Sequence, residues 1–567
     1  MKKFHANFLE PSQEQLNSLL ELYQTGKYPD AEKLSVSITE EFPKHQFAWK
    51  VLAVVLKQNG RINESLIVSQ KSVELDPLDA EAHNNLGVTL QEMGRLNEAE
   101  VSLRQAIKLK PDLAEGCSNL GNTLKELGRL KEAEVSLRQA IALKPDLADA
   151  HNNLGLTLQE MERLNEAEIS LRQAIKLKPD LTDAHNNLGI ILKKQGRLKE
   201  AEVSLRQAIA LKPDYVEAHS NLGNTLKELG RLDEALASYN KAIALKPDYA
   251  EAHNSLGMLL LKRSDFKNGL IQYEWRKKLP ENINNYKNIK GLEWQGENLN
   301  NKTILILSEQ GIGDIIQFSR YIYLIEKEYS VNIIFKTGKR IAYLFSKSKF
   351  KIIFNEDNIP KYDFYKHLMS LPKIYYEKTK TFPSQINFIP KDKKIALKWK
   401  ERLNEIKGFK VGINWQGNKA YKSDHLRSIP LNYFNDLFNI EKINFISLQK
   451  GFGLEQIKNF KHKDKLYDFS KEVDNGENIF EDTIGILQNI DLVISIDSSL
   501  VHLSSTLGIK TFALLHFCPD WRWNLITKEF SWYDNLKIYR QEEINKWDSI
   551  FSLLKKDLVA YEQRKRK

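Results

Sequence analysis

Cysteine is scarce in this chain of 567 residues, and no apolar run is long enough to cross a bilayer. The two cysteines, Cys117 and Cys518, are too few for a disulfide framework and lack the Cys/His spacing of a zinc site. A spanning helix needs about 20 consecutive apolar residues, and no apolar stretch follows the two lysines at the N-terminus. These absences predict a cytoplasmic protein without a transmembrane segment or a structural metal.

A strong charge of one sign is also missing. The 84 basic residues stand against 74 acidic ones, and the net charge of +10 comes from dispersed lysines. We therefore expect no nucleic-acid partner. The hydrophobic share of 42% and the length together predict an ordered chain of at least two domains.

A short motif recurs every 34 residues in the first half of the chain. AHNNLG begins at Ala82, and close variants begin at Gly116, Ala150, Ala184, Ala218 and Ala252. This period is typical of the tetratricopeptide repeat, a pair of antiparallel helices that stacks on its neighbours. Projected backwards, it adds diverged units at 12–45 and 46–79. The sequence therefore predicts an all-α superhelix over 12–283, whose last unit is also diverged.

Small residues at fixed places predict how the two helices of a repeat pack. A glycine on the first helix, such as Gly87, and an alanine on the second, such as Ala99, allow close approach. A second glycine ends the first helix, because the left-handed conformation favours glycine there. Glu162 replaces this glycine in one unit.

One histidine occurs in each of five repeats, and we interpret these histidines as packing residues rather than metal ligands. They are His83, His151, His185, His219 and His253.

One asparagine per repeat falls on the first helix, which lines the concave face in such arrays. These residues are Asn85, Asn119, Asn153, Asn187 and Asn221. An amide both donates and accepts hydrogen bonds, so a row of amides can hold an extended peptide backbone. The row resembles the asparagine ladder of repeat-bearing O-linked N-acetylglucosamine transferases. Recent duplication, which copies idle residues too, is the alternative explanation.

After residue 283 short apolar runs alternate with helical stretches, which predicts an α/β domain with parallel, doubly wound sheets. Strands are expected at 304–307, 332–335, 410–415, 443–448, 491–496 and 511–517. A lysine-rich helix after Pro390 separates two such sheets. The predicted halves are 284–405 and 406–567, with a ligand in the cleft between them.

Two strand-to-helix turns hold candidate binding groups. In the first, a helix is expected to open at Asp314, after Gly311 and Gly313; in the second, Asp497, Ser498 and Ser499 stand at the start of a helix. Such turns aim backbone N–H groups at anions beyond the strand ends. Ordinary helix capping by Asp and Ser is the alternative.

The segments GIGDIIQFSRY, VGINWQGNKAYKSDHLRSIPL, FISLQKG, ILQNIDLVISIDSSLVHLSSTLG and CPDWRWNL together resemble the glycosyltransferase domain found behind tetratricopeptide repeats in many bacterial proteins. That domain is similar to the heptosyltransferases of glycosyltransferase family 9, which have the GT-B fold of two Rossmann-like halves. The resemblance covers about residues 268–567.

The resemblance implies roles for particular residues. Asp314 matches the general base, Arg427 and the nearby Lys422 match the basic group on the donor phosphates, and a third set matches the donor-binding element. That set is Asp497, Ser498, Ser499 and His502. Ser498 and Ser499 stand where heptosyltransferases have threonine and glycine, and Gln317 stands where they have histidine.

The expected reaction is an inverting sugar transfer from a nucleotide-sugar to a peptide, protein or glycan acceptor that the repeats recruit. A base removes the acceptor proton, and cationic and backbone donors stabilise the leaving diphosphate. No two aspartates stand two positions apart, so a D-x-D metal site is absent and neither metal nor cofactor is expected. The alternatives are a repeat-type O-linked N-acetylglucosamine transferase and an interaction scaffold with an inactive domain.

Overall fold

A computed structural model describes residues 10–286, 289–383, 386–419, 421, 424–523 and 532–566. The chain divides into two compact units, Met1–Asn221 and Leu222–Lys567. The boundary lies within a repeat, between Asn221 and Leu222. The last repeats therefore belong to the same unit as the α/β part.

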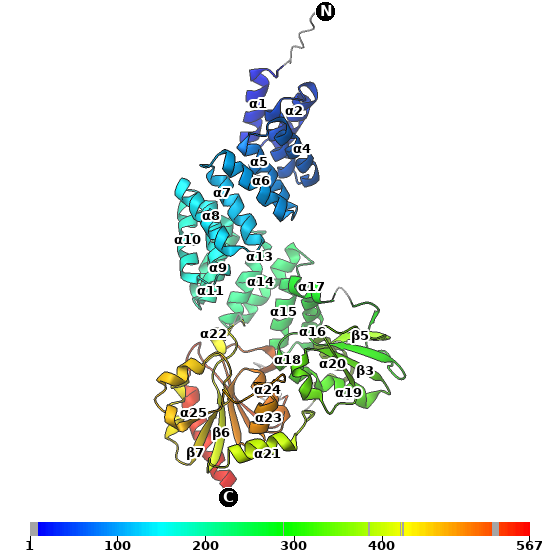
Figure 1. The fold of residues 1–567 in the computed structure, drawn as a ribbon, viewed down its shortest axis with the longest axis vertical. Coiled ribbons are helices and arrows are strands. Elements are labelled where there is room, and N and C mark those ends of the chain that lie inside the picture. Colours follow the sequence, from blue (N-terminus) through cyan, green and yellow to red (C-terminus); the bar gives the residue numbers. More distant parts are fainter. Residues whose placement is uncertain are drawn as a thin grey trace, which may run out of the picture. The chain divides into compact units, whose positions relative to one another are not determined.

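The first unit consists of helices in antiparallel pairs, drawn from blue to cyan in Figure 1. They are α1 (Gln13–Gln24), α2 (Tyr28–Glu41), α3 (Gln46–Gln58), α4 (Ile62–Leu75), α5 (Ala80–Glu92), α6 (Leu96–Leu109), α7 (Ala114–Glu126), α8 (Leu130–Leu143), α9 (Ala148–Glu160), α10 (Leu164–Leu177), α11 (Thr182–Lys194), α12 (Leu198–Leu211) and α13 (Val216–Glu228). Helix α13 continues into the second unit. The predicted all-α repeat architecture is confirmed, and α1 to α4 occupy the stretch where the motif itself is absent.

The glycine on the first helix of each repeat makes room for a leucine of the second. A Cβ atom on Gly87 would lie 2.5 Å from Leu103 Cγ and 3.3 Å from the carbonyl oxygen of Ala99. Gly121, Gly155 and Gly189 meet Leu137, Leu171 and Leu205 in the same way. Because contacts this short leave no space for a methyl group, glycine is required by close packing.

The turn between the two helices of a repeat uses the left-handed backbone conformation, as predicted. Gly94, Gly128 and Gly196 have φ values of 72°, 75° and 78°, and Glu162 has a φ of 61° at the equivalent place.

The repeated histidines have the packing role that was predicted. The ring Nε2 of each lies 2.9 to 3.1 Å from the carbonyl oxygen of the proline six residues earlier.

The second unit begins with the last repeats. Their helices are α14 (Leu232–Leu245), α15 (Ala250–Lys262) and α16 (Phe266–Tyr273), followed by the 3-10 helix η1 (Glu274–Lys278) and by α17 (Pro280–Tyr286).

A first parallel sheet has the order β1-β5-β2-β3-β4. Its strands are β1 (Leu292–Glu293), β2 (Thr303–Leu307), β3 (Asn332–Thr337), β4 (Lys351–Phe354) and β5 (Phe364–His367). Between them lie α18 (Ile312–Phe318), α19 (Arg320–Glu328), η2 (Lys339–Phe345), η3 (Leu368–Ser370) and α20 (Leu371–Thr379).

A second parallel sheet has the order β11-β10-β9-β6-β7-β8. Its strands are β6 (Phe409–Asn414), β7 (Ile443–Ser447), β8 (Leu466–Asp468), β9 (Leu492–Ile496), β10 (Thr511–Leu515) and β11 (Leu536–Arg540). The connecting helices are α21 (Lys393–Arg402), α22 (Asp424–Arg427), η4 (Leu431–Phe434), η5 (Leu437–Asn439), η6 (Leu454–Asn459), η7 (Lys463–Lys465), α23 (Glu481–Leu487), α24 (Ser499–Thr506), η8 (Trp521–Trp523) and α25 (Asp548–Arg566). The strand order is that of a doubly wound sheet, as predicted.

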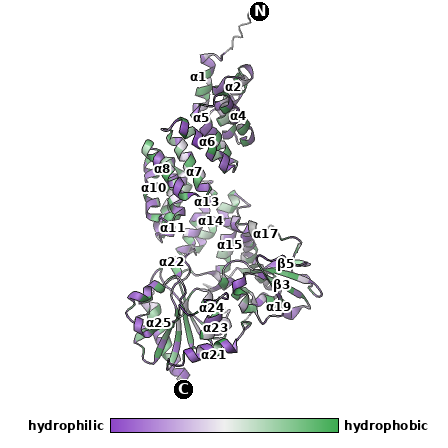
Figure 2. Ribbon diagram, in the orientation of Figure 1, coloured by the Kyte–Doolittle hydropathy of each residue, from purple (hydrophilic) through white to green (hydrophobic). Residues whose placement is uncertain are grey.

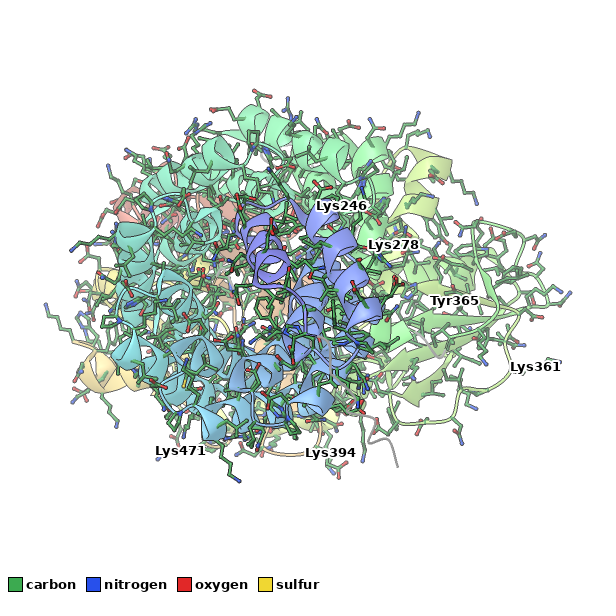
Figure 3. All side chains as sticks on the ribbon, turned by 90° about the horizontal axis from the view of Figure 1, so that it is seen from above. Lys246, Lys278, Lys361, Tyr365, Lys394 and Lys471 are labelled. Carbon is green, nitrogen blue, oxygen red and sulfur yellow. The ribbon has the colours of Figure 1, made fainter. Side chains whose placement is uncertain are left out.

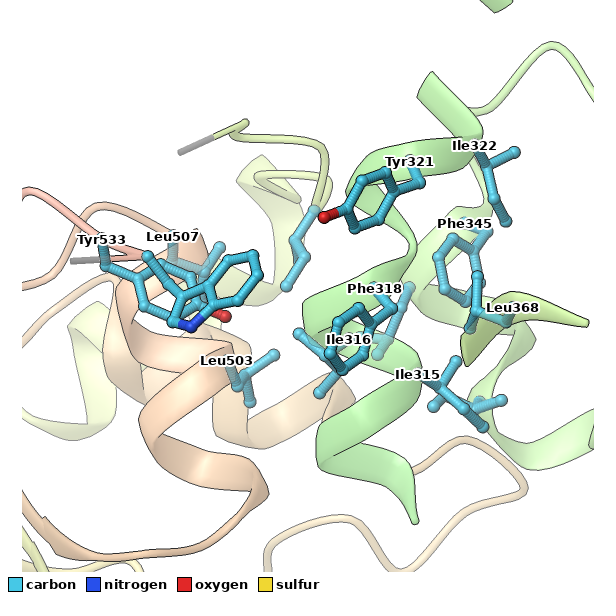
Figure 4. Packing of buried hydrophobic residues seen from close by; sticks show 14 of the residues in the cluster. Ile315, Ile316, Phe318, Tyr321, Ile322, Phe345, Leu368, Leu503, Leu507 and Tyr533 are labelled. Carbon is cyan, nitrogen blue, oxygen red and sulfur yellow. The ribbon is translucent and has the colours of Figure 1, made fainter. Parts of the chain in front are cut away.

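Central strands are apolar because both faces of each sheet are covered. All five residues of β9 and of β10 are buried, and Figure 2 draws the strands largely as hydrophobic. One apolar cluster joins the two sheets. In Figure 4, Ile316 and Phe318 of α18 face Leu503 of α24 and Tyr533, so this core fixes the facing ends of both helices.

Exposed lysines are spread over many segments of the chain. The labelled lysines of Figure 3, Lys246, Lys278, Lys361, Lys394 and Lys471, are all exposed and come from five separate places in the chain. Across the described ranges, no helix combines the length and the apolar character that a membrane crossing requires.

Candidate functional site

The candidate site lies where the carboxyl ends of the two sheets meet. In the second sheet the strand order reverses between β6 and β9; Asn414 is the last residue of β6, and Asp497 directly follows β9. In doubly wound folds, ligands bind at this reversal. From the first sheet, the loop after β2 leads into α18, which packs on α24.

Gly313 allows this approach of α18 to α24. A Cβ atom there would lie 3.1 Å from His502 Cδ2 and 3.4 Å from Ser499 Cα. Two segments that the sequence singled out separately, GIGD and DSSLVH, are therefore adjacent. Residues from both sheets share one site.

Asp314 occupies the third position of α18, which begins two residues before the predicted start. Its Oδ2 accepts a hydrogen bond of 3.1 Å from the backbone N–H of Gly311, so it also caps the helix. The side chain is 13% exposed. Burial raises the pKa of Asp314, and the neighbouring Arg522 guanidinium opposes that rise. A carboxylate in this setting is a stronger base than an exposed one.

Arg522 is the partner that sequence reasoning missed. It lies in η8, within the segment CPDWRWNL, and its Nη1 is 2.6 Å from Asp314 Oδ1. Its Nε is 3.3 Å from Asp520 Oδ1. Burial acts to lower the pKa of Arg522, but the charges of Asp314, Asp520 and Asp497 outweigh burial and raise it. The segment CPDWRWNL contributed to the family resemblance, but its sequence alone does not predict that Arg522 lies beside Asp314.

Arg427, predicted to hold the donor phosphates, lies at the end of α22 beside the loop after β6. Its Nε donates to Asp424 Oδ1 and its Nη1 donates to the carbonyl oxygen of Asp497, both at 2.9 Å. Its guanidinium lies 4.5 Å from the centre of the Tyr421 ring. The structure thus brings together Arg427 and Asp497, two residues for which the resemblance implies donor binding. Asp424 was not anticipated.

The turn after β9 forms a hydrogen-bonded group with the end of β6. Ser498 caps α24 by accepting from the Leu500 N–H at 3.3 Å, and its hydroxyl donates to Asn414 Oδ1 at 3.2 Å. The capping alternative for Ser498 is therefore realised, while Ser499 begins α24 and contacts the Gly313 position. Burial raises the pKa of Asp497, whose carboxylate lies within the field of Arg427 and Arg522.

Gln449 ties the loops after β6 and β7 together. Its Oε1 accepts from Asn414 Nδ2 at 2.8 Å and from the backbone N–H groups of Trp415 and Gln416 at 3.1 and 3.0 Å. This glutamine lies in FISLQKG, one of the segments that carry the resemblance, but the resemblance implied no role for it. Its buried amide explains why a glutamine follows that strand.

His502 points into the core. It is 3% exposed, its Nδ1 lies 3.0 Å from the Tyr533 hydroxyl, and its ring stacks on Trp523 at 5.3 Å between centres. Burial lowers its pKa well below the usual range, so the ring is neutral at pH 7. The geometry indicates a residue that positions α24. Lys422, the second phosphate candidate, lies outside the described residues.

The last repeat supports the loops of the site. Tyr273 hydroxyl and Gln310 Oε1 are 3.1 Å apart, while Arg276 binds both carboxylate oxygens of Glu309 at 2.9 Å. Lys262 Nζ donates to the carbonyl oxygen of Cys518 at 3.0 Å. Both the loop before Asp314 and the loop before Arg522 are therefore anchored on repeat-derived helices.

The asparagine row falls on the first helix of each repeat, as predicted, but several of its amides bond within the array. Asn119, Asn187 and Asn221 donate to Asn84, Asn152 and Asn186 of the preceding repeat at 2.9, 3.0 and 3.0 Å. Asn187 is buried, and Asn85, Asn119, Asn153 and Asn221 are half-buried. The row therefore has a structural role in addition to any partner contact.

Comparison with known proteins concerns the repeats. The TPR repeat family model matches residues 121–162, 191–230 and 223–263, and the tetratricopeptide repeat models match 80–113 and 148–181. Protein FlbA of Caulobacter vibrioides is 22% identical over 280 residues, which are 46% of this chain and 47% of that protein. The chain thus spans about half the length of this curated relative.

Similar solved structures cover the same part. TTC0263 of Thermus thermophilus, a thermophilic TPR protein, is 29% identical and has a TM-score of 0.29, covering 32% of this chain and 99% of that one. YrrB, described as a TPR protein with an unusual peptide-binding site, is 26% identical with a TM-score of 0.27, covering 32% and 95%. The matches to the family models show that the N-terminal part of this chain is an array of tetratricopeptide repeats.

Proposed function

We propose that the second unit is a metal-independent glycosyltransferase of the GT-B type, which transfers a sugar from a nucleotide-sugar to an acceptor recruited by the repeats. The observation that carries this proposal is the convergence of Asp314, from the first sheet, with Arg522, Arg427 and Asp497, from the second. A base and two guanidinium groups stand around one meeting point of two parallel sheets.

The guanidinium groups suit a departing nucleoside diphosphate. Arginine binds phosphate oxygens through two parallel N–H bonds and keeps its charge at every physiological pH. Arg427 is 17% exposed and Arg522 15% exposed, so both side chains are shielded from bulk water, where their attraction for a diphosphate would be weaker. Ser498 and Ser499 stand at the start of α24 and add polar groups on the same side.

Asp314 is the proposed general base. It takes the acceptor hydroxyl proton as the oxygen attacks the anomeric carbon, while the bond to the diphosphate breaks. In the free protein its carboxylate is paired with Arg522. A diphosphate that engages Arg522 would weaken this pair, and the loss of the positive partner would raise the pKa of Asp314 further. Donor binding and base strength are coupled in this scheme.

The repeats are proposed to recruit the acceptor through a polypeptide or glycan surface. The asparagine row supports a peptide-binding face, although its inter-repeat bonds occupy part of the amide groups. Replacing Asn119, Asn153 and Asn187 with alanine should weaken partner binding in a pull-down titration without unfolding the array. Unchanged affinity would reject the role of these amides.

The activity is tested with a panel of nucleotide-sugars, measuring sugar hydrolysis and the shift in melting temperature. The wild-type protein should respond to at least one nucleotide, whereas Arg427→Ala should lose the thermal shift. Asp314→Ala should keep the shift and lose hydrolysis. Arg402→Gln, which changes the exposed Arg402–Glu472 pair, is the matched control. Absence of any response would favour the scaffold alternative.

A further inference from the structure

A cavity of about 680 Å³ opens at the carboxyl ends of β2 and β3, next to the proposed base. Gln310 and Ile312, which flank the turn before Asp314, contribute to its wall, and Ile479 closes it from the segment that follows the second sheet's β8. A volume of a few hundred Å³ suits a ligand of one or two sugar rings. None of the predicted donor-binding residues lines it.

Three basic side chains line this cavity: Lys336 at the end of β3, and Lys339 and Arg340 at the start of η2. Glu309 is the acidic residue of the lining, and it is already bound by Arg276 through both carboxylate oxygens at 2.9 Å. Its charge is therefore compensated from outside the cavity.

The basic groups are largely available to a ligand. Lys339 is 3.5 Å from Glu477 in a pair whose side chains are 59% and 83% exposed, a type of contact that contributes little. Among the described residues, no carboxylate forms an ion pair with Lys336 or Arg340. The cavity thus presents an excess of positive charge on walls that also include the apolar side chain of Ile341.

We infer that this cavity holds the acceptor and that the acceptor is an anionic carbohydrate, with a carboxylate or a phosphate on its ring. The inference rests on the proposed function, because it identifies the ligand as the partner of Asp314. Lysine and arginine recognise carboxylates and phosphates through charge-assisted hydrogen bonds. Gln310 and Ser308 supply polar groups for sugar hydroxyls at the same wall.

The test is binding of glucuronate, glucose 6-phosphate and glucose to the full chain, measured by saturation-transfer NMR. At least one of the two anions should bind about tenfold more tightly than glucose, and comparison of the two shows whether a carboxylate or a phosphate is preferred. The double variant Lys336→Gln with Arg340→Gln should lose this preference. Lys302→Gln with Lys361→Gln, two exposed lysines at the opposite, amino end of the same sheet, should keep it.

Equal binding of all three sugars, or an unchanged preference in the Lys336/Arg340 variant, would overturn the inference. Nucleotide binding is measured in the same variants. Because nucleotide binding depends on Arg427 and not on Lys336 or Arg340, it distinguishes a wrong acceptor assignment from a wrong glycosyltransferase proposal. If the nucleotide binds and the anion preference is absent, the acceptor assignment alone is wrong. If the preference is present and no nucleotide binds, the glycosyltransferase proposal is wrong and the cavity remains an anion site.

Discussion

Arg522 Nη1 lies 2.6 Å from Asp314 Oδ1, although Arg522 is in η8, which follows β10 of the second sheet, and Asp314 is in α18, which follows β2 of the first. The guanidinium opposes the rise in the pKa of Asp314 that burial causes. A base held in this way is stabilised as the carboxylate, and the same contact restrains the loop before η8. The pair thus links the electrostatics of the site to the packing of the two sheets.

Replacing Arg522 with glutamine should raise the pKa of Asp314, because the positive neighbour is lost while burial remains. A base acts when deprotonated, so the acidic limb of the pH profile of kcat/KM should move to higher pH. Loss of a charge-stabilising donor should also reduce kcat by about 100-fold. Arg522→Lys keeps the charge and should keep the limb in place. The pH profile of nucleotide release checks both, and an unmoved limb in Arg522→Gln would contradict the pairing.

Gly313→Ala should push α18 away from α24. The new methyl group would lie 3.1 Å from His502 Cδ2, and the His502 ring is fixed by Tyr533 and Trp523, so it has little freedom to move. We expect a loss of about 1–2 kcal/mol in stability and weaker nucleotide binding. Gly476→Ala is the control, since no atom lies within 4 Å of its added carbon. Equal melting temperatures and affinities for the two variants would be inconsistent with this contact.

Most central strands could be predicted because they are largely apolar and buried; β5, which lies between β1 and β2 but has the polar sequence FYKH, is the exception. Strands β2, β3, β6, β7, β9 and β10 start within one residue of their predicted positions. Strands β1, β4, β5, β8 and β11 were not anticipated, since β1 and β8 have only two and three residues, β4 and β5 are four-residue strands that are partly exposed, and β11 alternates with exposed positions. Short or half-exposed strands leave no long apolar run to detect.

The site was predicted in part. Asp314, Arg427 and Asp497 belong to recognisable turns, and the proximity of Arg427 to Asp497 follows from the adjacent parallel strands β6 and β9, which end at the same edge of the second sheet. Arg522 could not be assigned in the same way, because its contact with Asp314 depends on how the two sheets meet. The bonds among Asn84, Asn119 and their equivalents depend likewise on the stacking of neighbouring repeats, which periodicity alone does not describe.

Acid should destabilise the second unit through His367, at the end of β5. Burial lowers the pKa of His367 from 6.5 to about 4. Its neutral form therefore contributes stability above pH 6.5, and this contribution is lost as the pH falls towards 4, with a total of about 3 kcal/mol. His367→Gln should flatten this part of the pH dependence.

Urea unfolding at several pH values, followed by tryptophan fluorescence, checks the role of His367. The second unit contributes every tryptophan except Trp49, so the signal reports mainly on it. His425→Gln, at an exposed position of the same unit, is the control. If both variants have the same slope as the wild type between pH 6.5 and 4, His367 is not the group responsible.

Glu162→Gly should stabilise the repeat array. Glu162 has a φ of 61° at the turn where Gly94, Gly128 and Gly196 have φ values of 72°, 75° and 78°. A side chain in the left-handed region costs about 1 kcal/mol relative to glycine. Helical circular dichroism during urea unfolding should show the variant unfolding at a higher concentration than the wild type.

The reciprocal change, Gly128→Glu, separates backbone strain from lost contacts. No atom lies within 4 Å of a Cβ added to Gly128, so the first carbon of a new side chain meets open space and the backbone strain is the expected main change. This variant should lose about the same 1 kcal/mol that Glu162→Gly gains. The two effects should cancel in the double variant, because the turns lie in different repeats and share no partner. If Gly128→Glu were instead more stable than the wild type, glutamate would make favourable contacts at this turn. Backbone strain at Glu162 would then not determine the stability of its repeat.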